Sequence, residues 1–326
     1  MNFMKPSTFL ALGLGASFAF AQGTAQAAWP DHPITIVLPT AAGSSFDSNI
    51  RKLGELLGKS LGQPIVVENR PGAGGAIAMS TVARATPDGY TLGVGNTASL
   101  AITPELGAKI SYDPLSSFTY ITRFTHQANI LVVRNSLPIK TVAELTAYSK
   151  KNPGKLSMGS QGTGSTGHLS GEIYKTLAGA DFIHVPYRGG PQAIQDLLGG
   201  RIDFLFENTS SIESQVAEGT VRALAVTTSE RISRFPDLPT MKEAGVAGFE
   251  ALSWTALLAP TGTPQAVIDR LKKEVNAVMS TTEFKKFLLD RGTVPDMGTS
   301  SEAKAFAVKE RAKWREVITQ SGASNN

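Results

Sequence analysis

The sequence predicts an α/β protein of two domains, each a mostly parallel sheet flanked by helices, with a hinge between them. Short apolar strands alternate with amphipathic helices in two separate series, within residues 34–95 and 130–227. Short connections between such elements favour parallel strands with covering helices. A chain of 326 residues is long enough for two ordinary domains.

The composition narrows the classes of function. Charged residues make up 18% of the chain, apolar residues 41%, and the formal net charge is +4. These values are typical of soluble globular proteins. Basic and acidic residues are interspersed and no stretch combines basic with aromatic residues, so we expect no nucleic-acid partner. Cysteine is absent, which excludes disulfides, thiol catalysis, cysteine-ligated metal and a lipid-bearing cysteine.

Residues 1–27 have the features of a secretory signal peptide. Lys5 gives a positive start, Phe9 to Ala21 is an apolar run too short to span a bilayer, and Ala25-Gln26-Ala27 is a small-x-small cleavage site. A buried N-terminal helix is the alternative, which the cleavage site disfavours. We therefore expect a mature chain from about Ala28, exported to the periplasm.

The first series opens with a strand from Ile34 to Leu38 and a loop, PTAAGSSFD, over residues 39–47. The loop is rich in small and hydroxyl residues and leads into a helix, a pattern typical of anion-binding loops. Asp47 either caps this helix or accepts a hydrogen bond from a ligand, and capping is favoured because acids are common in the first turn.

Further strands are predicted at residues 65–68 and 90–95, with a helix at 76–85 between them. In parallel sheets ligands bind at the carboxyl ends of the strands. Thr40, Ser44 and Asn96 fall at such ends.

The second series begins with a strand from Ile130 to Val133, after a less regular stretch. Asn208 follows a strand at residues 202–207 and either faces the same cleft or caps the next helix. The other predicted strands are 182–187 and 221–227, and the predicted helices are 141–151, 191–198 and 211–218.

The tail beyond Pro236 has a strand-like segment, Phe249 to Leu258, and helices at 264–279, 283–290 and 301–319. It is expected to return to the first domain, which makes that domain discontinuous. The predicted domains are residues 28–130 with 228–326, and 131–227, with a hinge near Ile130 and Thr227.

The stretch KLSMGSQGTGSTGHLSGE, residues 155–172, is the strongest candidate for a ligand site. A short strand enters a loop of glycines and hydroxyls, and a helix leaves it. The first amides of such a helix lack intrahelical partners and carry the positive end of the dipole, so the loop is suited to hold an anion.

Gly162, Gly164 and Gly167 also form a Gly-x-Gly-x-x-Gly motif, which raises the possibility of a dinucleotide site. That site requires an acid at the end of the next strand. Asp181 precedes the strand instead, so the dinucleotide interpretation is weak. A loop that only turns a corner is the other alternative, which the many hydroxyls disfavour.

Signatures of enzymes and metal sites are missing from the sequence. The four histidines include no pair at metal-ligand spacing, and there is no nucleophile elbow or P-loop lysine. His168 either touches a bound anion or packs at the helix start, and His184 is interpreted as structural. Arg188 can bind a carboxylate, but pinning its own loop is the preferred role.

Taken together, several segments resemble one family over essentially the whole mature chain, the Bug-type extracytoplasmic solute receptors of tripartite tricarboxylate transporters. The segments that carry the resemblance are VLPTAAGSSFD, VVENRPGAGGAIA, ATPDGYTLGVGN, SYDP, GSQGTGSTGHLSGE, HVPYRGGPQAIQDLLGGRIDFLFEN and RALAVTTSERISRFPDLPTMKEAG.

The resemblance implies a fold like that of the type II periplasmic binding proteins, which close on a ligand like a Venus flytrap. It also implies a carboxylate held between residues 40–47 and 160–166, without cofactor or metal, and delivery to membrane permease subunits by a monomeric receptor. The predicted ligand-binding residues are Thr40, Ala42, Gly43, Ser44, Ser45, Phe46, Asp47, Asn96, Ser160, Gly162, Thr163, Gly164, Ser165, Thr166, His168 and Asn208.

The first loop departs from the family pattern, which has an aromatic residue after the proline and two consecutive glycines. Thr40 and Gly43-Ser44 stand at these places, and Phe46 adds an apolar surface. We therefore expect a small mono- or dicarboxylate, with an apolar or aromatic body as one possibility. The competing functions are an exported enzyme using Asp47 or His168 as acid-base group, and a sensory co-receptor using the same cleft.

Overall fold

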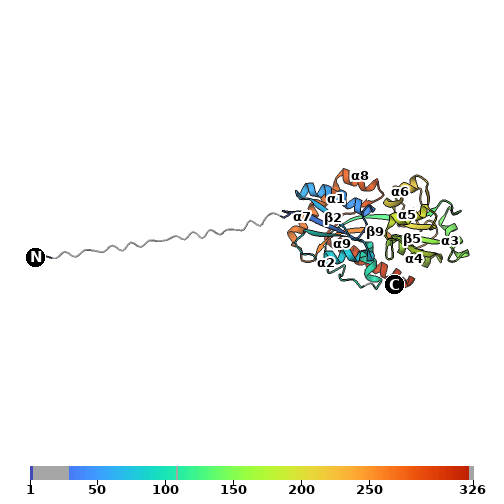
Figure 1. The fold of residues 1–326 in the computed structure, drawn as a ribbon, viewed down its shortest axis with the longest axis horizontal. Helices are drawn as coiled ribbons and strands as arrows, with labels where there is room; N and C mark the ends of the chain where they lie inside the picture. Colours follow the sequence, from blue (N-terminus) through green and yellow to red (C-terminus); the bar gives the residue numbers. More distant parts are fainter. Residues whose placement is uncertain (3–28, 108, 323–326) are drawn as a thin grey trace.

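The computed structural model describes residues 1–2, 29–107 and 109–322. Apart from its first two residues, the predicted signal peptide lies outside this part of the chain. Within the described residues no helix has the length and apolar character needed to cross a membrane. The described chain folds into two α/β lobes that lie side by side (Figure 1).

The first lobe is built on a sheet that combines parallel and antiparallel strands. The strands β1, β2 and β3 are parallel neighbours, and β9 pairs antiparallel with β3 and with the first part of β4. A short strand, β10, adds to β4. The bounds are β1 Ile34–Leu38, β2 Ile65–Asn69, β3 Thr91–Asn96, β4 Phe118–Arg134, β9 Leu252–Pro260 and β10 Val294–Pro295.

Helices from both ends of the chain cover this sheet, as the blue and orange ribbons of Figure 1 show. Leu53 and Leu57 of α1 and Leu271 and Val275 of α7 are fully buried in one core cluster with the apolar face of β1. Strand β9 pairs with β3 of this sheet, and α7 and α8 pack in the same core cluster. The helices are α1 Ser45–Leu61, α2 Ala76–Ala83, α7 Gln265–Ser280, α8 Thr282–Leu289 and α9 Ser300–Ser321.

The second lobe repeats the scheme with a smaller sheet. The parallel strands β6, β5 and β7 lie in this order, and β7 and β8 both pair antiparallel with the second part of β4. The strands are β5 Ser157–Ser160, β6 Ile183–Pro186, β7 Phe204–Asn208 and β8 Val221–Val226, and the helices are α3 Val142–Lys151, α4 Thr166–Ala178, α5 Gly190–Leu198 and α6 Thr209–Ala217.

Strand β4 links the lobes because it runs through both sheets. Its residues up to Ala128 pair with β9, and those from Asn129 onward pair with β7 and β8. At the same level Asn129 and Thr227 exchange hydrogen bonds, 2.9 and 3.0 Å, and the Ala251 amide donates to the Thr227 carbonyl. Two segments connect the lobes here, one at Asn129 of β4 and one at Thr227 after β8, and these hydrogen bonds hold them together.

The prediction of a short strand from Ile130 to Val133 is wrong in length, since β4 begins at Phe118. The missed part, FTYITRFTHQAN, mixes threonines, arginine, histidine and glutamine with its apolar residues. Thr122, Thr125 and Gln127 are nonetheless almost completely buried. Their side chains bond to neighbouring strands and loops, so the strand carries no continuous apolar run.

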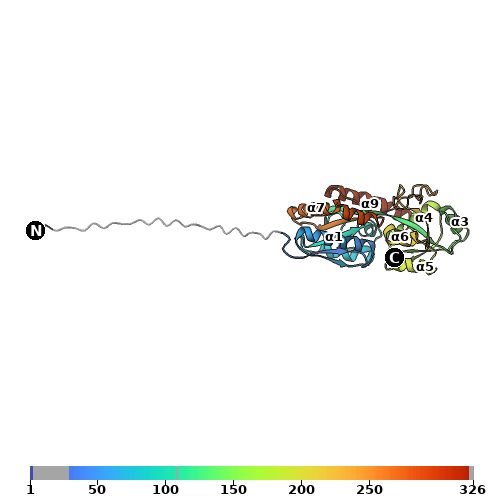
Figure 2. The same cartoon turned by 90° about the horizontal axis from the view of Figure 1, so that it is seen from above.

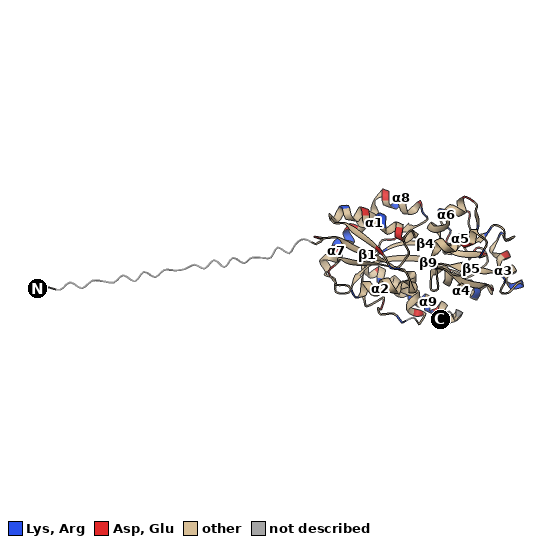
Figure 3. Ribbon diagram, viewed as in Figure 1, with Lys and Arg blue, Asp and Glu red and all other residues tan. Residues whose placement is uncertain are grey.

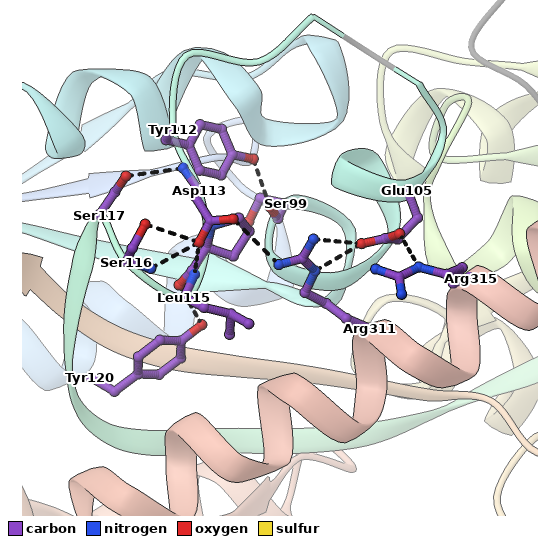
Figure 4. A network of polar contacts seen from close by, with 11 residues as sticks. Ser99, Glu105, Tyr112, Asp113, Leu115, Ser116, Ser117, Tyr120, Arg311 and Arg315 are labelled. Atoms are coloured by element: carbon purple, nitrogen blue, oxygen red, sulfur yellow. Dashed lines mark hydrogen bonds and ion pairs between the residues drawn. The ribbon is translucent and has the colours of Figure 1, made fainter.

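Helix α9 crosses from one lobe to the other and contacts both β4 and α4. Figure 2 shows α9 along one edge of the molecule. Arg311 and Arg315 of α9 both bond the Glu105 carboxylate at 2.7 Å, and Arg311 lies 3.6 Å from Asp113 (Figure 4). The segment around Glu105 is therefore fixed on α9.

That fixed segment includes a one-turn π-helix, η2 Ala98–Ile102, and a 3₁₀ turn, η3 Thr103–Glu105. Tyr112 donates to the Ser99 carbonyl at 2.6 Å, which holds η2 against the sheet. Elsewhere acidic and basic residues are interspersed around the outer helices and loops of both lobes (Figure 3).

Candidate functional site

A cavity of about 550 Å³ lies between the lobes. Loops at the carboxyl ends of strands form its wall, as expected for parallel α/β sheets. The lining residues are 39–41, 44–46, 71–75 and 96–98 of the first lobe, 161–163, 165–166, 187–191, 207–208 and 211 of the second, and Ser253 of β9.

The loop after β1 is organised by its own side chains. Ser44 is the N-cap of α1, and its Oγ accepts from the Asp47 amide and donates to Thr40 Oγ1. Asp47 in return accepts from the Gly43 amide at 2.9 Å. These reciprocal bonds fix the loop, and they leave the backbone amides of Ser45 and Phe46 without an acceptor among the described residues.

Asp47 itself is only 3% exposed and does not line the cavity. Its carboxylate also accepts from Asn69, 2.9 Å, and forms an ion pair with Arg51, 3.0 Å. The favoured prediction that Asp47 caps α1 is therefore not met, because Ser44 is the N-cap and Asp47 lies in the first turn of the helix. No oxygen of Asp47 is left to act on a molecule in the cavity.

A second loop of the first lobe, Pro71 to Gly75, lines the cavity and is absent from the predicted site. It precedes α2, and Thr103 of η3 donates to the Gly74 carbonyl at 3.1 Å. Gly75 has φ of +89°, and a side chain there would meet the side chains of Pro39 and Ser99 at less than 3 Å. Its place after a predicted strand, in the run NRPGAGG, was the available clue.

The glycine loop of the second lobe joins β5 to α4. Ser165 is the N-cap of α4 and accepts from the His168 amide, so the amides of Thr166 and Gly167 have no acceptor among the described residues. Gly162 has φ of +119°, and an added Cβ would lie 3.0 Å from the Tyr187 carbonyl oxygen. The N-termini of α1 and α4 therefore both border the cavity with free donors.

His168 supports this loop and does not line the cavity. Its Nδ1 accepts from the Gly164 amide at 3.2 Å. The ring stacks on His184 with centroids 4.1 Å apart, and His184 Nε2 lies 2.7 Å from Ser160 Oγ. Burial lowers the pKa of both histidines to about 4, so both are neutral at physiological pH. The packing role left open for His168 is the one that these contacts support.

The far end of the cavity is formed by α5, α6 and the loops before them. Asn208 occupies the N-cap position of α6 without a side-chain capping bond, and the residue borders the cavity. Arg188 is exposed, and its guanidinium makes no hydrogen bond or ion pair with any described residue. The expectation that Arg188 pins its own loop is therefore not supported.

Ten of the sixteen predicted residues line the cavity, namely Thr40, Ser44, Ser45, Phe46, Asn96, Gly162, Thr163, Ser165, Thr166 and Asn208. The other predicted residues, Ala42, Gly43, Asp47, Ser160, Gly164 and His168, lie in the same loops but outside the lining. Cavity residues absent from the prediction include Gln161, Arg188, Glu207, Ser211 and Ser253.

Among the described residues, the cavity lining combines a single free cation with apolar surface. Arg188 and Glu207 are the charged residues among those that border the cavity, while Phe46, Pro39 and Pro191 supply apolar walls. Ser45 Oγ and Ser211 Oγ approach to 3.5 Å across it. In the described part of the chain no group of three acidic or histidine side chains is placed to hold a metal ion. The arrangement suits a small anion with an apolar body.

Comparisons with known proteins agree with this geometry. Residues 50–323 match the family model described as the tripartite tricarboxylate transporter family receptor. The Bordetella pertussis protein BugT is 33% identical over 296 residues, which cover 90% of this chain and 91% of BugT.

Two solved structures from Rhodopseudomonas palustris are similar over nearly their whole length. Rpa4515, solved with adipate, has a TM-score of 0.87 and 34% identity, covering 91% of this chain and 99% of its own. MatC, solved with bound malate, has a TM-score of 0.84 and 31% identity, covering 89% of this chain and 100% of its own. These relatives are solute-binding receptors and not enzymes.

Proposed function

The chain belongs to the tripartite tricarboxylate transporter receptor family, and from this premise we propose that it captures a small organic carboxylate between its two lobes and delivers it to a membrane permease of that transporter class. The main support for this proposal is that the N-termini of α1 and α4 both border one cavity and both have free backbone amides. Amide donors at helix ends bind carboxylates well.

In this proposal the carboxylate binds between residues 44–46 and 162–166, and the remainder of the ligand lies against Phe46. The adipate of Rpa4515 and the malate of MatC support a dicarboxylate or hydroxy acid as the ligand. We place the hinge near Ile130 and Thr227, between a first domain of residues 28–130 with 228–326 and a second of 131–227. The mature receptor is expected to be a periplasmic monomer.

Calorimetric titration of ligand-free protein tests the binding part of the proposal. Succinate, malate, glutarate, adipate, citrate and benzoate would be compared with their amides, because an amide keeps the shape and removes the charge. We expect at least one acid to bind with one site per chain and its amide to bind far more weakly. Equal binding of an acid and its amide, or binding of citrate alone, would contradict the proposed ligand class.

Delivery to a permease needs a separate test in cells. Uptake of the labelled acid that binds in calorimetry would be measured in a strain lacking this protein and in the same strain complemented with it. Uptake that depends on the protein supports transport. Unchanged uptake would favour the sensory role, which uses the same cleft.

Arg188 is the free cation among the described residues that line the cavity, and we expect Arg188→Ala to weaken carboxylate binding about tenfold, since a charge-assisted hydrogen bond is lost. Arg188→Lys should lose less because the charge remains. Calorimetry with the acid identified above measures both.

Arg201→Ala is the matched control, because Arg201 is an exposed arginine of the same lobe that pairs with Asp196 and does not line the cavity. Its loss should leave the affinity unchanged. Equal affinities of wild type and Arg188→Ala would show that Arg188 does not contact the ligand.

A further inference from the structure

Glu207 is a buried acid at the wall of the cavity. It lies at the carboxyl end of β7 and is 1% exposed. Oε1 accepts from the Asn208 amide at 2.9 Å, whereas Oε2 is buried and has no partner among the described residues. Gly190, at the start of α5, covers the group so closely that a Cβ there would lie 2.8 Å from Oε2.

The surroundings of Glu207 offer no charge that would stabilise a carboxylate. On β4, Ile130 is its direct neighbour. Gln161 lies in the loop after β5. Its Nε2 donates to the Phe206 carbonyl, and its Oε1 has no donor among the described residues. His168 at the start of α4 is neutral and bonded to Gly164, and the residue at the N-cap position of α6 is the uncharged Asn208.

Arg188, which precedes α5, is the charged side chain of this wall, and no cation offsets the effect of burial on the pKa of Glu207. Burial raises that pKa to about 7, and the nearby Gln161 side chain and the hydrogen bond from the Asn208 amide oppose the rise. A buried carboxylate with so few donors is unfavourable, and the neutral acid is the form that such a site stabilises.

An anionic ligand in the same cavity adds a negative charge beside this group. Like charges at short range disfavour the ionised form further. Protonation removes this repulsion, and the O–H of the neutral acid is a hydrogen-bond donor. Gln161 Oε1, which is also buried and has no donor among the described residues, is an acceptor for this proton.

We propose that Glu207 is a specificity-determining residue that carries a proton when the receptor is loaded, so that the cavity wall presents no negative charge to the second carboxylate of a dicarboxylate ligand, and that binding is therefore linked to proton uptake by this side chain. The inference rests on the proposed carboxylate function and names its ligand class more narrowly.

Calorimetry in two buffers of different ionisation enthalpy, phosphate and Tris, measures the protons taken up on binding. The probes are succinate, malate, glutarate and adipate, which are fully ionised above pH 7. We expect wild type to take up about half a proton per ligand near pH 7 and close to one at pH 8.5, with affinity falling up to about tenfold per pH unit above 7.

Glu207→Gln keeps the shape and cannot ionise. We expect no proton uptake and an affinity that changes less than about twofold between pH 7 and 9. Glu218→Gln is the control, because Glu218 is an exposed acid at the end of α6, and it should behave as wild type. Infrared difference spectra of wild type, recorded on adding the acid, should show a carboxyl C=O band independently of any variant.

The outcomes separate the two proposals. Binding without proton uptake, uptake that persists in Glu207→Gln, or the absence of a carboxyl band would overturn the role of Glu207 and leave carboxylate binding intact. If none of the four acids binds between pH 6 and 9 while a monocarboxylate does, the dicarboxylate inference fails alone. If no acid of either kind binds, the proposed function fails with it.

Discussion

Replacing Gly162 with alanine should lower the affinity for carboxylates by at least about 100-fold, because the glycine loop can no longer keep its shape. Gly162 has φ of +119°, which L side chains rarely adopt, and its Cβ would press on the Tyr187 carbonyl. Relief of this strain must move the residues that present Ser165 and the free amides of α4 toward the cavity. Calorimetry with the acid that wild type binds measures the loss.

Gly154→Ala is the matched control. Gly154 also has a positive φ, +68°, but it lies in the turn after α3 with open space around it and outside the cavity lining. This variant should lose about 1 kcal/mol of stability and keep its affinity. Equal affinities for Gly162→Ala and wild type would show that the glycine loop does not hold the ligand.

Acidification from pH 6.5 to 4 should cost the protein several kcal/mol of stability through His168 and His184. Burial holds the pKa of each at about 4 in the folded state, against 6.5 for an exposed histidine. Between these values the unfolded chain binds protons that the folded chain does not, so stability falls as pH falls, by about 3 kcal/mol per histidine. Below pH 4 this loss is complete.

Glu207 changes the stability in the opposite direction over part of this pH range. Burial raises its pKa from 4.5 to about 7, so its contribution to stability increases as pH falls between these values. Urea unfolding of the Glu207→Gln variant at several pH values therefore isolates the histidines. Adding His184→Phe, which keeps a ring stacked on His168, should remove about half of the slope. A free energy of unfolding that is constant from pH 6.5 to 4 would contradict the neutral, buried pair.

The sequence was sufficient for most of the fold because each parallel strand is short, apolar and followed by a loop with turn residues. The strand β1, for example, has the predicted bounds, Ile34–Leu38. The first part of β4 was missed because its buried threonines and Gln127 are satisfied by contacts from other strands and loops, which no local pattern reveals. Likewise, nothing in the helical pattern of α9 indicates its contact with α4 in the other lobe.

Site residues could be predicted where loop chemistry is local. Ser44 and Ser165 stand before helices in glycine-containing loops, and both are N-caps at the cavity. Glu207 and Arg188 were not assigned to it, because burial and the absence of a partner decide their roles, and both depend on the packing of α5 against β7. His168 stands beside the loop in sequence, yet its ring turns toward Gly164 and His184.

We expect the cleft to carry an organic acid, and native mass spectrometry of the protein as purified would detect it. The bound molecule would be released by denaturation and identified, and the cleft variant Gly162→Ala, purified in parallel, would show whether it came from the cleft. We predict one small carboxylate per chain in wild type and none in the variant. Release of a nicotinamide or flavin cofactor, or of any molecule without a carboxylate, would contradict this expectation.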